Sequence, residues 1–347
     1  MGLPPTPPRR APGMAPIDST TASGSTIDLS GNELTEVPPF ENPGNITHLR
    51  LQANRLTVLP DEIGDLTNLV DLNLYGNRLT ALPKAVGNLA RLTNLDLYIN
   101  RLTAIPESIG NLTSLSNLNL ADNRLTALPD TIGKLTDLTK LKLANNQLTA
   151  LPDTVGNLLN LTELDLTRNP LKTLPETIGN LVELKHLVMW DNPLAILPEQ
   201  IGNLINLSKL FLGGNRLTAL PDTIGNLTEL TELVLWSNDL KTLPDEIGNL
   251  TNLTKLDLSG SYRLTALPDT IGNLTELTEL VLEDAGLTVL PDTIGNLTSL
   301  TKLDLSGNRL TTLPDTIGNL TNLTELYMDQ EVFEALPKPL QDLVWWD

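Results

Sequence analysis

One asparagine returns along this chain at a fixed interval, and that interval limits the folds open to it. The pattern LxxLxLxxNxL recurs every 23 residues. The series is Asn54, Asn77, Asn100, Asn123, Asn146, Asn169, Asn192, Asn215 and Asn238, with Asn308 resuming it after one extra residue. A fixed period of this length indicates stacked units that bury their apolar faces against one another. We therefore expect an elongated array rather than separate globular domains.

Each unit contains a strand pattern and a return segment. The leucines of LxLx alternate with other residues, which indicates a β-strand with one buried face, and one strand per unit requires a parallel sheet. The return segment reads L-P-[DE]-x-I-G-x-L. Its proline fits the first position of a short helix, and the following acid is favoured by the helix dipole. The glycine is expected to end or loosen that turn.

The repeated asparagine is best explained by structure rather than by catalysis. A turn off the strand leaves buried backbone groups that need partners, and a stacked amide can both donate and accept. The series breaks at Ser261 and Ala285, where Tyr262 is inserted. We therefore predict a local irregularity between Leu258 and Leu287.

These units resemble the leucine-rich repeat family over roughly residues 26–336, in the LPxxIGxLxxLxxLxLxxNxL form of Ras-group intracellular and bacterial arrays. The resemblance implies an α/β solenoid, a horseshoe with a concave parallel β-sheet and short helical or 3-10 turns on its convex side. It also implies a protein-binding role. About thirteen repeats are expected, together with a partial N-terminal unit that carries Asn32.

The two ends depart from the pattern. Residues 1–25 are rich in Pro, Ser and Thr and are expected to be a disordered tail. Within them, Pro4-x-x-Pro7-x-Arg9 matches an SH3-ligand pattern, which short proline-rich tails also match by accident. Residues 337–347 are expected to cap the last open face of the core, because a solenoid must cover its ends.

Composition argues against several functions. The net charge of −19 disfavours nucleic acid and anionic membrane as partners and leaves a protein or peptide, possibly basic. Cysteine is absent and the two histidines, His48 and His186, lie far apart, so we predict no metal site and no cofactor. No nucleophile–base pair or phosphate loop is evident, so we predict that the chain is not an enzyme.

Targeting signals are also missing from the sequence. No apolar run approaches the ~18 residues of a membrane span, and the N-terminus lacks the apolar region of a secretory signal. A cytoplasmic location is therefore expected, with a secreted or surface protein of a bacterium as the alternative. The sequence does not determine the oligomeric state, for which a monomer is our expectation.

The candidate site comes from positions that point out of the concave sheet. Six of the eleven aromatic residues fall there, and Trp190, Phe211 and Trp236 belong to successive repeats. Clustered exposed aromatics are typical of interface hot spots. The predicted partner-binding residues are His186, Val188, Trp190, Asp191, Lys209, Phe211, Gly213, Glu232, Val234 and Trp236, with Tyr75 and Tyr98 as a secondary patch.

Three functions fit this pattern. The first is a non-catalytic scaffold that binds a protein partner on the concave face. The second is a receptor for a small ligand, such as a sugar or a peptide end, stacked in a slot between Trp190 and Trp236 above Gly213. The third is a consensus-like array without a natural ligand. A closed arrangement, in which the two indoles cover each other across Gly213, is the alternative to an open slot.

Overall fold

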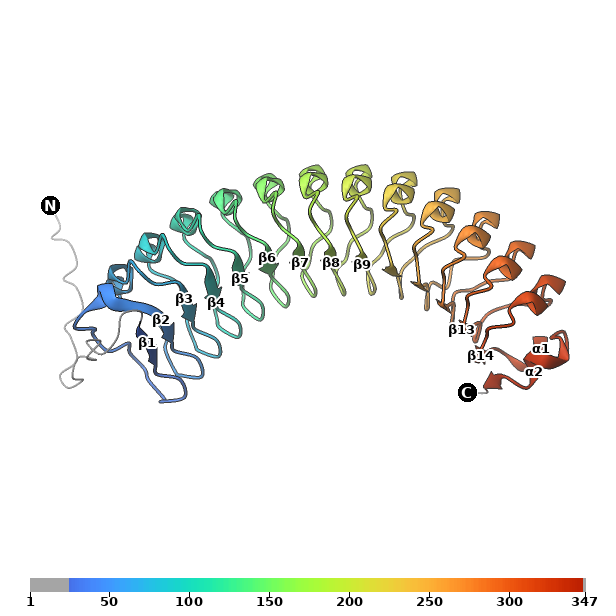
Figure 1. Ribbon diagram of the computed structural model, residues 1–347, viewed down its shortest axis with the longest axis horizontal. Coiled ribbons are helices and arrows are strands. Elements are labelled where there is room, and N and C mark those ends of the chain that lie inside the picture. The colour runs from blue at the N-terminus through green and yellow to red at the C-terminus, as the bar shows by residue number, and fades with distance from the viewer. Residues whose placement is uncertain (1–24, 346–347) are drawn as a thin grey trace.

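The computed structural model describes residues 25–345, which form one curved solenoid (Figure 1). Fifteen strands make a single parallel sheet in chain order. The strands are β1 (Ser25–Asp28), β2 (Ile46–Arg50), β3 (Asp71–Asn73), β4 (Asn94–Asp96), β5 (Asn117–Asn119), β6 (Lys140–Lys142), β7 (Glu163–Asp165), β8 (His186–Val188), β9 (Lys209–Phe211), β10 (Glu232–Val234), β11 (Lys255–Asp257), β12 (Glu279–Val281), β13 (Lys302–Asp304), β14 (Glu325–Tyr327) and β15 (Val344–Trp345).

Short helices lie on the convex side of the arc, opposite the strands (Figure 1). The 3-10 helices are η1 (Pro43–Asn45), η2 (Asp61–Asp65), η3 (Lys84–Asn88), η4 (Glu107–Asn111), η5 (Asp130–Lys134), η6 (Asp153–Asn157), η7 (Glu176–Asn180), η8 (Glu199–Asn203), η9 (Asp222–Asn226), η10 (Asp245–Asn249), η11 (Asp269–Asn273), η12 (Asp292–Asn296) and η13 (Asp315–Asn319). Two α-helices follow β14, α1 (Gln330–Phe333) and α2 (Lys338–Gln341). The predicted α/β solenoid with a concave sheet is thus confirmed. None of these helices within residues 25–345 has the length and apolar composition needed to cross a lipid bilayer.

The core is a column of aliphatic side chains between the sheet and the short helices. One unit adds seven fully or largely buried residues, Leu115, Leu118, Leu120, Leu125, Leu128, Ile132 and Leu135, and the neighbouring units repeat the set. Since each layer buries its apolar surface only against the next, hydrophobic burial stabilises the stack rather than any single unit.

The asparagine of each repeat joins two layers through buried hydrogen bonds. In Asn146, Nδ2 donates to the carbonyl oxygens of Leu120 (2.9 Å) and Leu143 (3.0 Å). Its Oδ1 accepts from the backbone N–H of Leu125 at 2.9 Å. One amide therefore satisfies backbone groups of its own turn and of the preceding repeat, which confirms the predicted structural role.

The return segments differ from the sequence-based interpretation in two respects. Proline is the N-cap rather than the first helical residue, so the acid after it occupies the first position, as in Pro60 and Asp61. The glycine lies inside the 3-10 helix and has no positive φ. A Cβ on Gly64 would lie 2.6 Å from the carbonyl oxygen of Ala85 in the next repeat. This glycine is therefore required by close packing between repeats, and not by a helix end.

The turn after each strand uses the left-handed backbone region. Gly76, Gly214 and Gly307 adopt it, and so do polar residues such as Asn145 (φ 54°). Among the described residues with positive φ, Ile99 is the one with a β-branched side chain, which is strained at its φ of 51°. Ile99 is also 42% exposed, so burial offsets only part of that strain.

The predicted irregularity between Leu258 and Leu287 is confined to a loop. The extra residue, Tyr262, is 65% exposed, and the Oγ of Ser261 is buried without a hydrogen-bond partner among the described residues. The strands on either side keep their register, with Lys255 opposite Glu279. The insertion therefore removes asparagine bonds locally and leaves the concave sheet intact.

The structure at the two ends of the solenoid can be compared with the predicted domain boundaries. Ser25 begins β1, whereas the rest of the predicted tail, residues 1–24, lies outside the described residues. Beyond β14, Leu340 is buried, and Phe333, Leu343 and Val344 pack against the core. The strand β15 also pairs with β14. A capping role for residues 337–347 remains a prediction that these contacts support.

Removing a central asparagine should destabilise the array strongly. In Asn146→Ala, backbone groups of two repeats lose their partners while remaining buried, and we expect the free energy of unfolding to fall by about 2–3 kcal/mol. Urea denaturation followed by circular dichroism measures this change. Asn157→Ala, at the exposed end of η6, is the matched control and should be nearly neutral. Equal effects of the two substitutions would contradict the assigned role.

Relieving the strain at Ile99 should stabilise the protein. We expect Ile99→Gly to raise the free energy of unfolding by roughly 0.5–1 kcal/mol, since the left-handed penalty exceeds the entropy cost of glycine. Asn145→Gly serves as the control and should gain less, because asparagine tolerates this region. A loss of stability in Ile99→Gly would show that its side chain makes a stabilising contact.

Candidate functional site

The ten residues predicted for partner binding come together on three neighbouring strands. Residues of β8, β9 and β10 pair in register, so His186, Lys209 and Glu232 form one row. Val188, Phe211 and Val234 form the next row. The remaining four, Trp190, Asp191, Gly213 and Trp236, lie in the turns that follow these strands. The sequence columns are thus rows of spatial neighbours.

Two of the aromatic side chains form a stacked pair. The ring centroids of Trp190 and Phe211 lie 5.7 Å apart, with 24° between the ring planes. Trp190 remains 37% exposed, and Val188 and Phe211 are half-buried. Val234, in contrast, is only 7% exposed and is therefore buried. An offset stack of this kind presents a broad apolar surface in which each ring restrains the other.

Trp236 fills the space that the sequence suggested as a slot. A Cβ added to Gly213 would collide with Cε2 and Nε1 of the Trp236 indole, so this ring lies directly on the glycine backbone. Trp236 is half-buried in this position. The expectation of an open slot between Trp190 and Trp236 is therefore wrong: an indole occupies the glycine gap itself. The alternative function, a receptor for a small ligand, required this open slot, and the structure does not contain it.

The same three repeats lack a hydrogen bond that other repeats make. At Asn73, Asp96, Asp165, Asp257 and Asp304 the side-chain Oδ1 accepts from the backbone N–H two residues later at 3.0 Å. Asp28 and Asn119 accept the same bond at 3.0 and 3.2 Å. Val188, Phe211 and Val234 occupy the equivalent positions and cannot accept, and the same holds for Arg50, Lys142 and Val281. Each such bond contributes about 0.5–1.5 kcal/mol, so an apolar surface has replaced a stabilising cap in three successive repeats.

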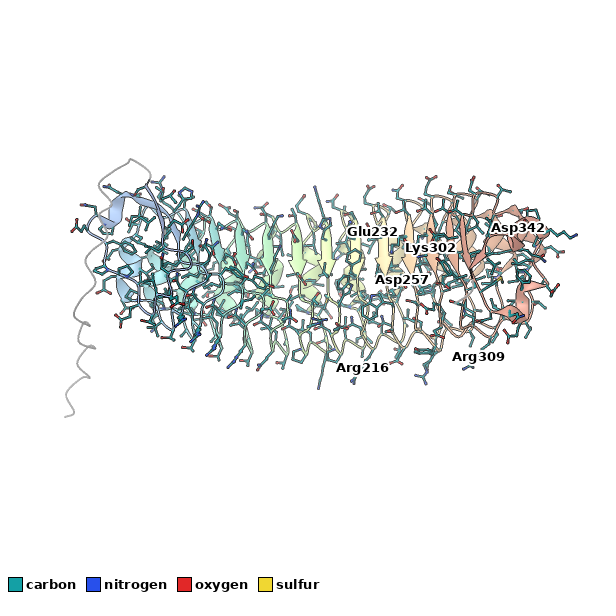
Figure 2. All side chains as sticks on the ribbon, turned by 90° about the horizontal axis from the view of Figure 1, so that it is seen from below. Arg216, Glu232, Asp257, Lys302, Arg309 and Asp342 are labelled. Carbon is teal, nitrogen blue, oxygen red and sulfur yellow. The ribbon has the colours of Figure 1, made fainter. Side chains whose placement is uncertain are left out.

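Charges at the edge of this surface are paired. Nζ of Lys209 lies 2.7 Å from Oε1 of Glu232, and Nε of Arg168 lies 3.2 Å from Oδ2 of Asp191. The Lys–Glu alternation continues along the concave face, where Lys255 and Lys302 both contact Glu279 at 3.1 and 3.6 Å. Figure 2 shows this face, with Glu232, Asp257 and Lys302 labelled. Such exposed pairs contribute little stability and leave the surface close to neutral.

The secondary patch lies apart, in the turns after β3 and β4. The rings of Tyr75 and Tyr98 stack with centroids 5.3 Å apart and 16° between their planes. Ile99, which the sequence-based site omitted, is exposed next to Tyr98 in the chain. The sequence could have indicated Ile99, since other repeats place glycine, alanine or a polar residue at the equivalent position.

Carboxylates accompany the tyrosines. Burial raises the pKa of Asp96, and the negative charge of Asp122 raises the pKa of Tyr98. Within residues 25–345, no salt bridge involves Asp71, Asp96 or Asp122. The secondary patch therefore combines aromatic surface with three carboxylates that form no salt bridge within residues 25–345, although the charge of Lys142 acts on Asp96. The charges around Trp190, in contrast, are paired.

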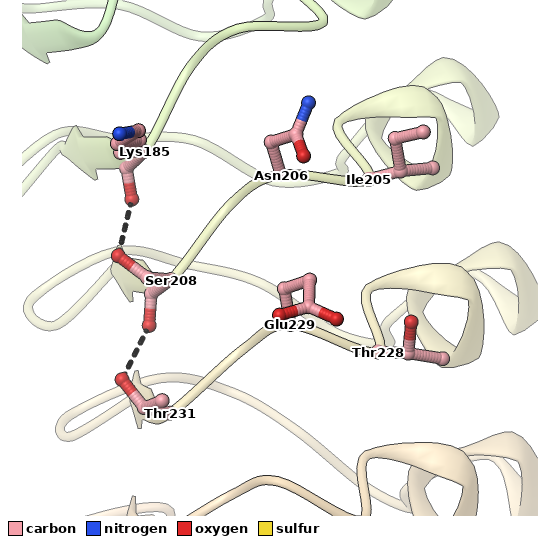
Figure 3. Close-up of a pocket in the computed structure, with 7 residues that line it drawn as sticks. All are labelled: Lys185, Ile205, Asn206, Ser208, Thr228, Glu229 and Thr231. Carbon is pink, nitrogen blue, oxygen red and sulfur yellow. Dashed lines mark hydrogen bonds between the residues drawn. The ribbon is translucent and has the colours of Figure 1, made fainter.

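A shallow depression on another face carries no comparable chemistry. It lies between η8–η9 and the strands β9–β10, and it is lined by Lys185, Ile205, Asn206, Ser208, Thr228, Glu229 and Thr231 (Figure 3). Ser208 Oγ donates to the carbonyl oxygen of Lys185 at 3.1 Å, and Thr231 Oγ1 to that of Ser208 at 2.9 Å. These hydroxyls join neighbouring repeats, so their role is structural. Among residues 25–345 there is also no cluster of three potential metal ligands.

Comparison with known proteins gives a consistent result. The family described as "Leucine-rich repeat region" matches residues 26–143, 126–212, 194–285, 233–303 and 269–344. Comparison with curated proteins finds no match.

Solved structures extend this similarity. A leucine-rich repeat protein of Leptospira interrogans is 33% identical, with a TM-score of 0.65 over 94% of this chain and 96% of its own. The plant peptide hormone receptor RGFR1, in complex with RGF2, is 32% identical with a TM-score of 0.73, over 87% of this chain and 50% of the receptor. An internalin of Listeria monocytogenes, 24% identical with a TM-score of 0.70 over 93% of this chain and 86% of its own, shares the fold.

The position of Trp236 depends on the missing side chain at Gly213. In Gly213→Ala the new methyl group must displace the indole, and we expect the 15N–1H indole resonance of Trp236 to shift. Overpacking should also lower the free energy of unfolding by about 1–3 kcal/mol. Gly44→Ala is the control, because a Cβ there meets no atom within 4 Å. An unchanged indole resonance would show that Trp236 does not rest on Gly213.

Proposed function

The chain belongs to the leucine-rich repeat family, and we propose that it is a non-catalytic scaffold that holds a protein or peptide partner on its concave face. The fold is a general protein-interaction scaffold, and some of the similar structures are receptors. The proposed contact surface is the aromatic platform, which we define as Val188, Trp190, Phe211 and Trp236. Val234 lies in the same row but is only 7% exposed, so we leave it out of this surface.

The missing caps of β8–β10 carry this proposal. Folding alone favours Asp or Asn at the positions of Val188, Phe211 and Val234, since seven other repeats use them to bind the turn. Arg50, Lys142, Val281 and Tyr327 also depart from this pattern, but among the described strands only β8–β10 do so in three successive repeats, each time with an apolar residue. We take this run as a sign of a requirement other than folding.

The platform suits a partner with an apolar anchor. Trp190 and Phe211 supply rigid aromatic area at its centre, where truncation of a hot-spot residue usually has its largest effect on binding. The paired charges of Lys209 and Glu232 form a rim with little net field. Selectivity would then rest on shape and apolar contact, and a strongly basic partner is not required.

A related array provides a precedent for a peptide partner. RGFR1 is described as a peptide hormone receptor and was solved in complex with RGF2. This chain spans half of that receptor, so the likeness supports the class of partner and not its identity. A cytoplasmic monomer remains our expectation from the sequence.

Two substitutions taken from neighbouring repeats test the proposal. Trp190→Thr copies Thr167, and Val188→Asn copies Asn73 and restores the cap. For a partner captured with the wild-type protein and then purified, we expect each variant to weaken binding, Trp190→Thr by about 2 kcal/mol, or about 30-fold in Kd. Isothermal titration calorimetry measures both.

Stability separates this site from a structural role. Val188→Asn should keep or raise the free energy of unfolding by about 0.5–1 kcal/mol, because the N–H of Trp190 regains an acceptor. Tyr262→Thr, in the exposed loop insertion, is the matched control for binding. If Trp190→Thr and Val188→Asn both bound the partner with wild-type affinity, the platform would not be the binding site.

A further inference from the structure

The secondary patch differs from the aromatic platform in being acidic, and we propose that it binds the chain's own proline- and arginine-containing segment, residues 4–10. We define this acidic tyrosine patch as Tyr75, Tyr98, Ile99 and the carboxylates of Asp71, Asp96 and Asp122. The inference concerns a separate surface and does not rest on the proposed function of the platform.

Like the aromatic platform, this patch exposes apolar residues. Tyr75 is 37% exposed and Ile99 is 42% exposed, although neither residue is needed by the leucine core. Ile99 keeps a strained backbone conformation at a position where polar residues and glycine serve other repeats. Stacked aromatic rings beside an aliphatic side chain form the kind of surface on which proline-rich segments dock.

The carboxylates of the patch favour a positively charged ligand. Glu163, farther along the same face, is neutralised by Lys140 at 3.1 Å and Lys142 at 3.7 Å. Asp71, Asp96 and Asp122 form no salt bridge within residues 25–345, as noted above. Their carboxylates would accept charge-assisted hydrogen bonds from guanidinium groups, which also stack on aromatic rings. The patch therefore fits a segment with both prolines and arginines.

The chain itself contains such a segment. Residues 4–10 read PPTPPRR, and Arg9 and Arg10 are the first charged side chains of the sequence, followed only by Asp18 before β1 begins. No other stretch of this acidic chain combines two adjacent arginines with a run of prolines. These residues lie outside the described part of the chain, so their assignment rests on composition and reach.

The reach is sufficient for binding within one molecule. Fourteen residues separate Arg10 from Ser25, and they can span up to roughly 46–50 Å. The patch follows β3 and β4, and β4 is only three strands from β1 in the sheet, or about 14 Å. A tether this short keeps the local concentration of the segment high, which favours its own patch over that of another molecule.

Selective labelling tests this contact in the full chain. The protein has four tyrosines and no cysteine, so 15N-tyrosine gives few signals and Thr6→Cys accepts a single nitroxide label. We expect loss of the Tyr75 and Tyr98 signals by paramagnetic broadening, while the Tyr262 and Tyr327 signals persist. Adding Arg9→Glu and Arg10→Glu, which lie outside the repeat pattern of the sequence, should restore the lost signals.

Two outcomes would overturn the proposal. One is broadening that is absent or equal for all four tyrosines, or that survives the charge reversal. The other is loss of the Tyr75 and Tyr98 signals when unlabelled spin-carrying protein is mixed with 15N-labelled protein that carries no spin, since this requires contact between molecules. Broadening confined to the doubly labelled molecule and abolished by charge reversal supports the intramolecular contact.

Discussion

The buried asparagine amide is the contact on which the rest of this molecule depends. Each amide fixes the turn of its own repeat and accepts a backbone N–H of the preceding repeat, as Asn146 does for Leu125. Leucine burial supplies the larger free energy, but aliphatic packing alone does not define how far one layer is rotated against the next. The directional bonds of the amide hold that geometry. They keep the strands in register, so that positions from separate repeats become neighbours on one surface.

This division of labour explains why folding and binding occupy different residues. Leucine, asparagine and glycine positions are set by contacts between layers, and glycine shows this most clearly, since a Cβ at Gly64 would enter the next repeat. Outward positions have no such constraint, and several repeats fill them with Asp or Asn that stabilise the turn locally. The stretch from β8 to β10 abandons that local stabilisation for Val188, Phe211 and Val234. A surface made at the expense of stability is the clearest sign of function in this chain.

Much of this arrangement could be predicted from the sequence, because the repeat period determines strand direction, register and the outward columns. The period predicted that Trp190, Phe211 and Trp236 would be neighbours, and they are. Side-chain conformation could not be predicted in the same way. Whether Trp236 would stand beside Gly213 or lie on it depends on the shape of the local backbone, which spacing does not encode. The role of the glycine in each Ile-Gly pair could not be predicted for a similar reason. It depends on the distance between two stacked repeats, which the sequence of a single repeat does not reveal.

The central claim is that a partner occupies the concave face at β8–β10 through the aromatic platform. Amide hydrogen exchange of the free and partner-bound protein, followed by mass spectrometry, tests it most directly. The account predicts slower exchange on binding for peptides that cover 186–191, 209–214 and 232–237, with little change in the 3-10 helices of the convex side. Protection confined to those helices, or to the loop around Tyr262, would contradict it.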